Sequence, residues 1–321
     1  MRTFYFLIQG TLPVAVPLML VALGGMFSET SGVINIGLEG IMLFGSFVGC
    51  LVMYFLNDVG ADPQMLLLMG MLIAAVAGAV FSMLLAFAAV NMKADQTIVG
   101  TAMNMLVPAI VLLYCKIKFN SDSVTTHVEP YITEVPYVSK IPVIGDLFFK
   151  DTYITIYIGA LLLAIMTIVF YKTRFGLRLR ACGEHPHAAD SVGIHVSRMR
   201  YAGVGISGVL GGIGGLFYSV GVADSNCNGH SGVAGFGFLA LAVMIFGQWK
   251  PLRIAWASLF FAFLRKVAYS IPLIPFLDAL NINQAFYKML PYIATMVVLA
   301  FTSKKSRAPK AEGIPFDKGK R

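Results

Sequence analysis

Charged residues are scarce in this chain. Only 12% of its 321 residues are Asp, Glu, Lys or Arg, whereas 58% are hydrophobic, and the mean hydropathy is +0.78. A soluble domain carries about 25% charged residues, so the deficit excludes an ordinary soluble enzyme or binding module. Several apolar runs of about twenty residues are long enough to cross a bilayer. We therefore expect one polytopic membrane domain over residues 1–302.

Cysteine pairs and nucleotide-binding signatures are also missing. The four cysteines lie far apart in the chain, so they predict neither a disulfide framework nor a paired-cysteine metal site. No G-x-x-x-x-G-K-[ST] segment occurs, which excludes ATP hydrolysis by a P-loop. Residues 224–229 begin like a calcium-binding loop, but Gly235 stands where that loop needs a glutamate. We expect no enzymatic activity, no metal and no cofactor.

The apolar runs predict an all-α bundle of about eight to ten membrane helices. Open strands would leave backbone groups unpaired in lipid, which favours helices. Segment 236–248 would cover only about 20 Å as a helix, so we expect it to be half of a broken span. The apolar segments lie at residues 10–27, 33–56, 64–90, 96–115, 153–171, 200–222, 236–248, 252–270 and 286–302.

The net charge of +8 comes mainly from two places, residues 172–200 and a tail at residues 303–321. Cytoplasmic loops of membrane proteins carry an excess of Lys and Arg, so this distribution favours a membrane orientation over nucleic-acid binding. Both basic regions fall on the same side when the spans are counted. Segment 116–152 then lies outside, and Arg265 and Lys266 break the pattern. The side of the N-terminus stays open.

A basic, helix-forming island at residues 175–194 separates two long apolar runs. Its segment His187-Ala188-Ala189-Asp190-Ser191-Val192-Gly193 resembles the Glu-Ala-Ala-x-x-x-Gly coupling loop of bacterial ABC importer permeases, with His187 in place of the acid. Residues 32–40, 176–184, 237–242, 246–251 and 290–292 resemble further motifs of the same permeases, in the same order. The chain is therefore similar to permease subunits of nucleoside-type ABC importers, within the superfamily of branched-chain amino-acid and simple-sugar permeases.

This resemblance implies a transport subunit in the bacterial plasma membrane, in contact with membrane lipid. It implies a separate ABC ATPase, an extracellular substrate-binding lipoprotein and a second related permease, in a heterodimer or alternatively a homodimer. Ribose-type sugars and branched-chain amino acids remain alternative substrates, and a secondary transporter or channel is the other functional class. The residues that would couple the chain to the ATPase are Arg178, Arg180, Glu184, Ala188, Ala189 and Gly193.

Polar residues within the apolar runs are candidates for the substrate path. Asn35 and Glu39 share a face if their segment is helical. A polar stripe on the span at 96–115 consists of Gln96, Thr97, Gly100, Thr101 and Asn104. Such groups should face the protein interior or a water-filled cavity. Two structural alternatives stay open: Glu39 caps the start of a broken helix, and the stripe joins helices. The candidate path residues are Asn35, Glu39, Gln96, Asn104, Phe236 and Phe238.

Residues 208–215 contain two overlapping G-x-x-x-G patterns. Small residues at this spacing let helix backbones approach closely in membranes. We expect this face to pack against other helices.

Overall fold

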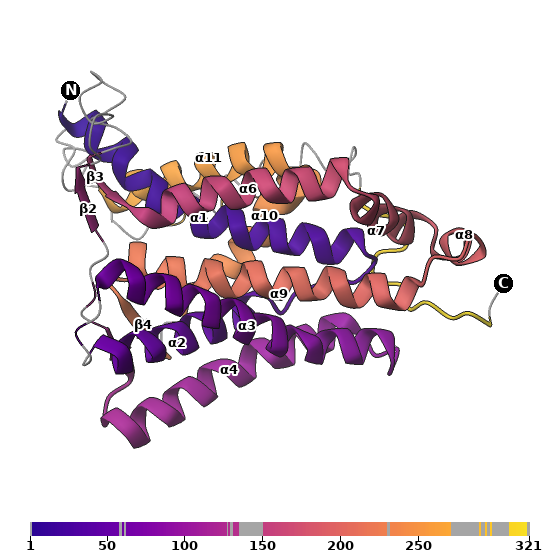
Figure 1. Cartoon of the computed structure of the whole chain (residues 1–321), viewed down its shortest axis with the longest axis horizontal. Helices are drawn as coiled ribbons and strands as arrows, with labels where there is room; N and C mark the ends of the chain where they lie inside the picture. The colour runs from indigo at the N-terminus through magenta and orange to yellow at the C-terminus, as the bar shows by residue number, and fades with distance from the viewer. Residues whose placement is uncertain are drawn as a thin grey trace.

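The computed structural model describes residues 2–57, 60, 62–126, 128, 131–134, 150–229, 232–270, 289, 293, 296 and 308–319. Long helices run side by side along the long axis of the molecule (Figure 1). The helices are α1 (Arg2–Thr30), α2 (Leu38–Asn57), α3 (Pro63–Val90), α4 (Gln96–Phe119), α6 (Ile154–Lys172), α7 (Arg174–Glu184), α8 (Pro186–Ser191), α9 (Val196–Gly221), α10 (Phe236–Phe246) and α11 (Pro251–Tyr269).

Within the described residues, six helices are long and apolar enough to cross a membrane: α1, α2, α3, α4, α6 and α9. Helix α10 is apolar but has only 11 residues, too few to span a bilayer. Helix α11 has 19 residues and includes Arg253, Arg265 and Lys266. These elements confirm a polytopic helical bundle. The predicted span at 286–302, with its motif at 290–292, lies almost wholly outside the described residues.

In the part of the chain that the structure describes, four short strands form two antiparallel pairs at one end of the bundle (Figure 1). Strand β1 (Ser123–Thr125) pairs with β4 (Asn226–Asn228), and β2 (Tyr131–Glu134) pairs with β3 (Lys150–Tyr153). We call this the strand end. Helices α7 and α8 and residues 308–319 lie at the opposite end, which we call the basic end (Figure 1).

Helix α9 occupies the centre of the bundle. It packs closely on α1, α2 and α3. The apolar 18-residue stretch of α9 is 83% buried inside the protein, whereas that of α6 is only 17% buried. A Cβ atom added to Gly212 would overlap the carbonyl of Ala74 on α3, and one on Gly215 would overlap that of Met42 on α2. The predicted close-packing glycine face is therefore confirmed, and α6 is peripheral.

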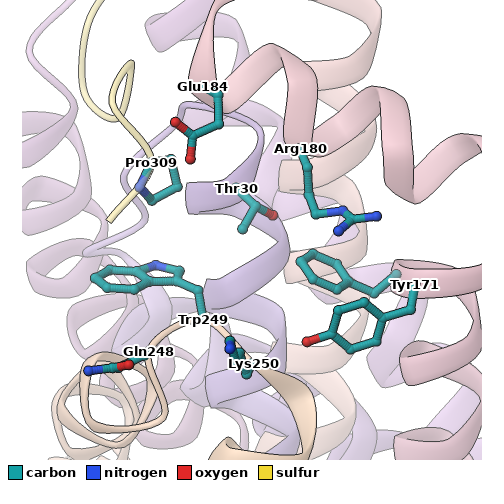
Figure 2. Close-up of a pocket in the computed structure, with 9 residues that line it drawn as sticks. Thr30, Tyr171, Arg180, Glu184, Gln248, Trp249, Lys250 and Pro309 are labelled. Atoms are coloured by element: carbon teal, nitrogen blue, oxygen red, sulfur yellow. The ribbon is translucent and has the colours of Figure 1, made fainter. Parts of the chain in front are cut away.

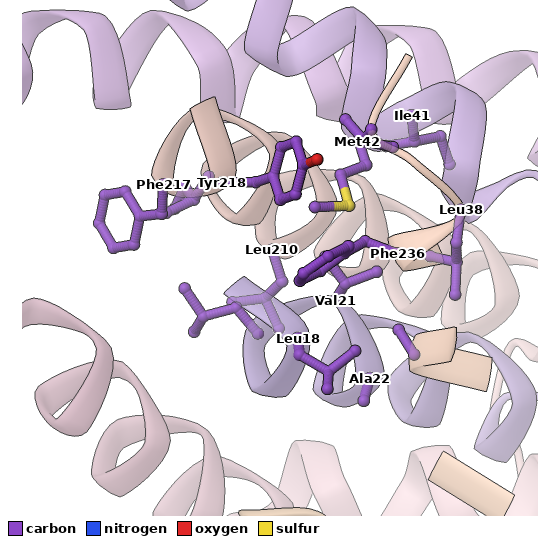
Figure 3. Packing of buried hydrophobic residues seen from close by; sticks show 14 of the residues in the cluster. Leu18, Val21, Ala22, Leu38, Ile41, Met42, Leu210, Phe217, Tyr218 and Phe236 are labelled. Atoms are coloured by element: carbon purple, nitrogen blue, oxygen red, sulfur yellow. The ribbon is translucent and has the colours of Figure 1, made fainter. Parts of the chain in front are cut away.

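The hydrophobic core joins residues that are far apart in the sequence (Figure 3). Leu18 of α1, Met42 of α2, Leu210 of α9 and Phe236 of α10 are all fully buried. The core thus fixes the short helix α10 against the long helices that surround it.

The described part of the tail packs on the basic end. The amide of Ala311 donates to the carbonyl of Gly183 on α7 (2.8 Å), and the amide of Gly313 donates to the carbonyl of Gly32 (3.2 Å). Phe316 packs on a small cluster that contains Ala189 of α8. Lys318 lies 3.7 Å from Asp190. Residues 308–319 are therefore bound along α7 and α8.

Candidate functional site

The chain leaves helical structure between α1 and α2. Segment 33–56 was expected to be one span, but α2 begins at Leu38. Asn35 therefore lies outside the helix, and the expected helical face shared with Glu39 does not form. Gly32 adopts a left-handed conformation (φ +96°) that ends α1, and the Ser28 hydroxyl donates to the Val33 carbonyl (2.8 Å). We call residues 31–40 together with 235–237 the helix junction.

Two side chains of α4 pair with the backbone of the helix junction. Gln96 accepts a hydrogen bond from the Ile34 amide (2.7 Å). Asn104 accepts from the Gly40 amide (2.7 Å) and donates to the Ile36 carbonyl (2.9 Å). Because non-helical backbone at membrane depth must find partners within the protein, these amides stabilise the interruption. Gln96, Gly100 and Asn104 of the predicted stripe thus face the interior, whereas its two threonines, Thr97 and Thr101, are exposed.

Asn35 is fully buried in the helix junction. Its Nδ2 donates to the hydroxyl of Ser207 on α9 (2.9 Å). Its Oδ1 and the Nε2 of Gln96 have no hydrogen-bond partner among the described residues. Buried polar atoms are rarely left unpaired, so one acceptor and one donor remain available at this site.

Glu39 connects the starts of two helices. It lies in the first turn of α2, and its carboxylate accepts hydrogen bonds from the amides of Gly235 (2.9 Å) and Gly237 (2.6 Å) at the start of α10. A carboxylate is favoured at helix N-termini, where the dipole is positive. The capping role is therefore present, although the helix that Glu39 caps is α10, about two hundred residues later in the chain.

The two candidate phenylalanines have different surroundings. Phe236 is fully buried; its ring lies 4.5 Å from that of Tyr218, and the Arg265 guanidinium lies 4.2 Å from its centroid. Phe238 is 49% exposed. Phe236 thus anchors α10 in the core. Of the two phenylalanines, Phe238 is the one whose ring a ligand or partner can reach.

The coupling candidates divide into outward and inward groups. Arg178, Glu184 and Ala188 are exposed, whereas Ala189 is 4% exposed and packs inside the protein. Gly193 follows α8 in a left-handed conformation (φ +84°), with open space where a side chain would begin. Arg180 is half-buried. The outer face of this region is therefore formed by α8 and Gly193, and Ala189 contributes to its packing instead.

A buried polar cluster at the basic end was not anticipated. Glu29 is 4% exposed at the end of α1 and accepts a hydrogen bond from the Trp249 indole (2.7 Å). Burial raises the pKa of the nearby Glu312 carboxyl, while its hydrogen bond with Glu29 lowers it. Arg200 is 1% exposed, and its guanidinium has no hydrogen-bond partner among the described residues. The sequence signal for this cluster is Glu29, an acid that lies between the apolar runs 10–27 and 33–56.

Comparison with known proteins places the chain in a family. The family model for the permease component of branched-chain amino acid transport systems matches residues 7–299. The chain belongs to this permease family. It is 43% identical to the guanosine ABC transporter permease NupQ of Bacillus subtilis, over 98% of this chain and 97% of that protein. It is 38% identical to the nucleoside ABC transporter permease NupC of Lactococcus lactis, over 99% of each chain.

A third relative, the nucleoside ABC transporter permease NupB of Lactococcus lactis, is 25% identical over 97% of this chain and 85% of its own. No solved structure matches the sequence. The permease is thus a multi-pass transport subunit of the membrane, which in bacteria is the plasma membrane.

Proposed function

We propose that this permease is the membrane subunit of an ABC importer for nucleosides. The observation that carries the proposal is the 43% identity to a guanosine permease over almost the whole of both chains. A putative glucose permease of Haloferax volcanii is only 28% identical. The similarity to a branched-chain amino acid permease of Methanocaldococcus jannaschii covers 22% of this chain. Simple sugars and branched-chain amino acids are the alternative substrates.

The helix junction supports the proposal that the substrate path passes beside α2, α4 and α10. Transporters often build such paths from interrupted helices whose N-termini face the solute, and here α2 and α10 start at the same carboxylate, Glu39. Asn35, Gln96 and Asn104 surround the interruption, and Phe238 is the accessible ring. An aromatic ring and amide groups suit a nucleobase and its hydrogen-bonding edges.

The unpaired atoms of Asn35 and Gln96 suggest how this path changes. An acceptor and a donor left without partners in one conformation gain them in another, and alternating access requires two conformations of the same helices. Glu39 transmits such a change directly, because a shift of α2 moves the amides at the start of α10. Asn35 and Gln96 contact substrate or re-pair during transport, while Glu39 and Phe236 position α10.

The two ends of the bundle support the proposed partners. The basic end would face the cytoplasm, with the outer face of α8 and Gly193 docked on a separate ATPase. The strand end would face the extracellular binding lipoprotein. Lactococcus lactis has two nucleoside ABC transporter permeases among the relatives, NupB and NupC, which supports a heterodimer of two permeases here.

Uptake by the complete transport system tests the substrate class. Cells that express the system should accumulate radiolabelled guanosine or adenosine, and unlabelled nucleoside should compete. Cells that lack this permease provide the background. Accumulation of ribose or leucine without any nucleoside would overturn the substrate class while leaving the permease assignment intact.

A matched pair of glycines tests the docking face. Gly193 and Gly60 both have positive φ and open space for a Cβ atom, so leucine should cost each about 1 kcal/mol of backbone strain. Gly193→Leu should leave membrane insertion intact, retain ATP hydrolysis and lose most uptake. Gly60→Leu, between α2 and α3, should transport normally. Equal uptake by the two variants would contradict ATPase docking at α8.

A further inference from the structure

A pocket of about 310 Å³ opens at the basic end. Its walls come from the end of α6, from α7, and from the turn that joins α10 to α11 (Figure 2). Arg180 and Tyr171 form one side, Trp249 forms the opposite side, and Lys250 lies below (Figure 2). None of the six proposed substrate-path residues lines this pocket.

The pocket carries unneutralised positive charge. Arg180 and Lys250 both line it, and neither forms an ion pair among the described residues. The only hydrogen bond found for the Arg180 side chain in the described structure runs from Nε to the Gly176 carbonyl (3.3 Å), so its terminal nitrogens are available. Glu184, the one carboxylate of the lining, is exposed. The pocket therefore suits an anion.

The aromatic walls are held in fixed positions. The Trp249 indole donates to buried Glu29, and Arg180 lies over the rings of Phe170 (5.2 Å) and Tyr171 (5.6 Å). Gln248 and Trp249 are consecutive non-glycine residues with φ of +51° and +52°. Each such conformation costs on the order of 1–3 kcal/mol and is retained where the surroundings impose it. The turn thus holds Trp249 in the pocket at a conformational cost.

A separate apolar cavity of about 500 Å³ lies farther along α6 and α11. It lies between α1, α6 and α11, and its lining includes Val16, Leu163 and Leu259. Leu163 precedes Tyr171 by two helical turns, so the cavity lies about 12 Å farther along α6 than the charged pocket. We call this cavity the α1–α6–α11 groove. A charged pocket followed along α6 by an apolar groove suits a molecule with an anionic head and a hydrocarbon chain.

We propose that the Arg180–Lys250 pocket binds the phosphate group of an anionic phospholipid, whose acyl chain lies in the α1–α6–α11 groove. Aromatic residues at the ends of membrane helices lie at headgroup level, and basic pockets between such helices bind anionic headgroups. A guanidinium can pair with two phosphate oxygens at once. Because Arg180 belongs to α7, the bound lipid braces α7 against the start of α11.

Lipid binding by the purified full-length permease tests this site. In native mass spectrometry with added phosphatidylglycerol, the wild-type chain should retain one lipid more tightly than it retains phosphatidylcholine. The double variant Arg180→Gln/Lys250→Gln should bind phosphatidylglycerol roughly tenfold to thirtyfold more weakly. Arg174→Gln, which removes an exposed charge from the same helix without altering the lining, should bind as wild type does.

Two further variants keep the test decisive if the double variant is unstable. Arg180→Lys retains the charge but loses the paired contact, so it should bind with intermediate affinity. Ala160→Trp fills the apolar groove and should weaken phosphatidylglycerol binding with both cations in place. Unchanged binding by a folded double variant or by Ala160→Trp would overturn the proposal, as would equal retention of phosphatidylcholine. Displacement of the lipid by guanosine monophosphate or inorganic phosphate at equal concentration would assign the pocket to a soluble anion instead.

Discussion

The helix junction and the basic-end pocket treat their polar groups in opposite ways. At the junction, Asn104 and Glu39 satisfy four backbone groups between them. In the pocket, Arg180 and Lys250 lack an anionic partner among the described residues. The first region supplies its own partners and so holds interrupted helices in a defined geometry. The second leaves charge for a molecule that is not part of the chain.

Asn104→Leu should have the largest effect, because it removes partners that the helix junction supplies for its own backbone. The Gly40 amide and Ile36 carbonyl would lose their partner, at about 1–3 kcal/mol for each buried group, so the free energy of unfolding should fall by about 2–6 kcal/mol. Asn91→Leu is the matched control, since Asn91 is exposed and bonds to Tyr201; it should cost about 1 kcal/mol or less. Denaturation of both variants in detergent measures the difference. Equal costs would mean that the junction does not depend on Asn104.

Glu39→Gln should have a smaller effect on stability and a clear effect on transport. Glutamine keeps one acceptor but removes the charge at the start of α10, which should cost about 1–2 kcal/mol. Nucleoside uptake should fall, because the amides of Gly235 and Gly237 would no longer move with α2.

Asp95→Asn is the control for Glu39→Gln, since Asp95 caps the exposed start of α4. Uptake assays on folded protein should show nearly normal transport for this variant. If Glu39→Gln transports as well as Asp95→Asn, α10 is positioned by packing alone.

Glu312→Gln should produce the smallest change, and one that depends on pH. Burial raises the pKa of Glu312 above its usual value of 4.5, so the folded tail favours the protonated acid. The stability that Glu312 contributes to the packing of residues 308–319 on the bundle is therefore fully present below pH 4.5. It is lost as the pH rises through the raised pKa. The protection of residues 308–319 against hydrogen exchange, taken relative to the intrinsic exchange rate at each pH, should be lower at about pH 8 than at about pH 5 in the wild type.

The side chain of the Glu312→Gln variant stays neutral at every pH. The protection of residues 308–319 against hydrogen exchange should therefore no longer depend on the titration of residue 312. Asp62→Asn, at the start of α3, serves as the control and should keep the wild-type profile. A wild-type pH profile in Glu312→Gln would remove Glu312 as the responsible group.

The sequence predicts the spanning helices well, because long apolar runs have only one stable form in lipid. It also predicts that Gln96 and Asn104 face inward and that the glycines of α9 pack closely, but it wrongly includes Thr97 and Thr101 in the inward face. It does not predict that Gln96 and Asn104 bond to residues 34–40, since that contact depends on the register of two separate helices. The sequence predicts a helix at Asn35 because segment 33–56 is a long apolar run, although Gly37 and the alternative role of Glu39 as the cap of a broken helix both point to an interruption.

Burial of charge at the basic end is harder still to foresee. Arg200 belongs to a basic loop in the sequence, and such residues are ordinarily solvated. The structure buries it because residues 308–319 cover the ends of α1 and α7, a contact between segments more than a hundred residues apart. The contact between Trp249 and Glu29 also joins segments that are far apart in the sequence, the end of α1 and the turn between α10 and α11.

The central position of α9 also sets the order in which the molecule can mature during synthesis. Helices α1, α2 and α3 leave the ribosome first, yet each packs on a helix that begins only at Val196. At roughly 5–20 residues per second, the early helices wait on the order of ten seconds for that partner. During this interval Asn35 lacks Ser207, and Gly78 and Ala74 face an unfilled groove. The nascent chain is then most exposed to quality-control proteases. Codons that slow translation before α9 would lengthen that exposure.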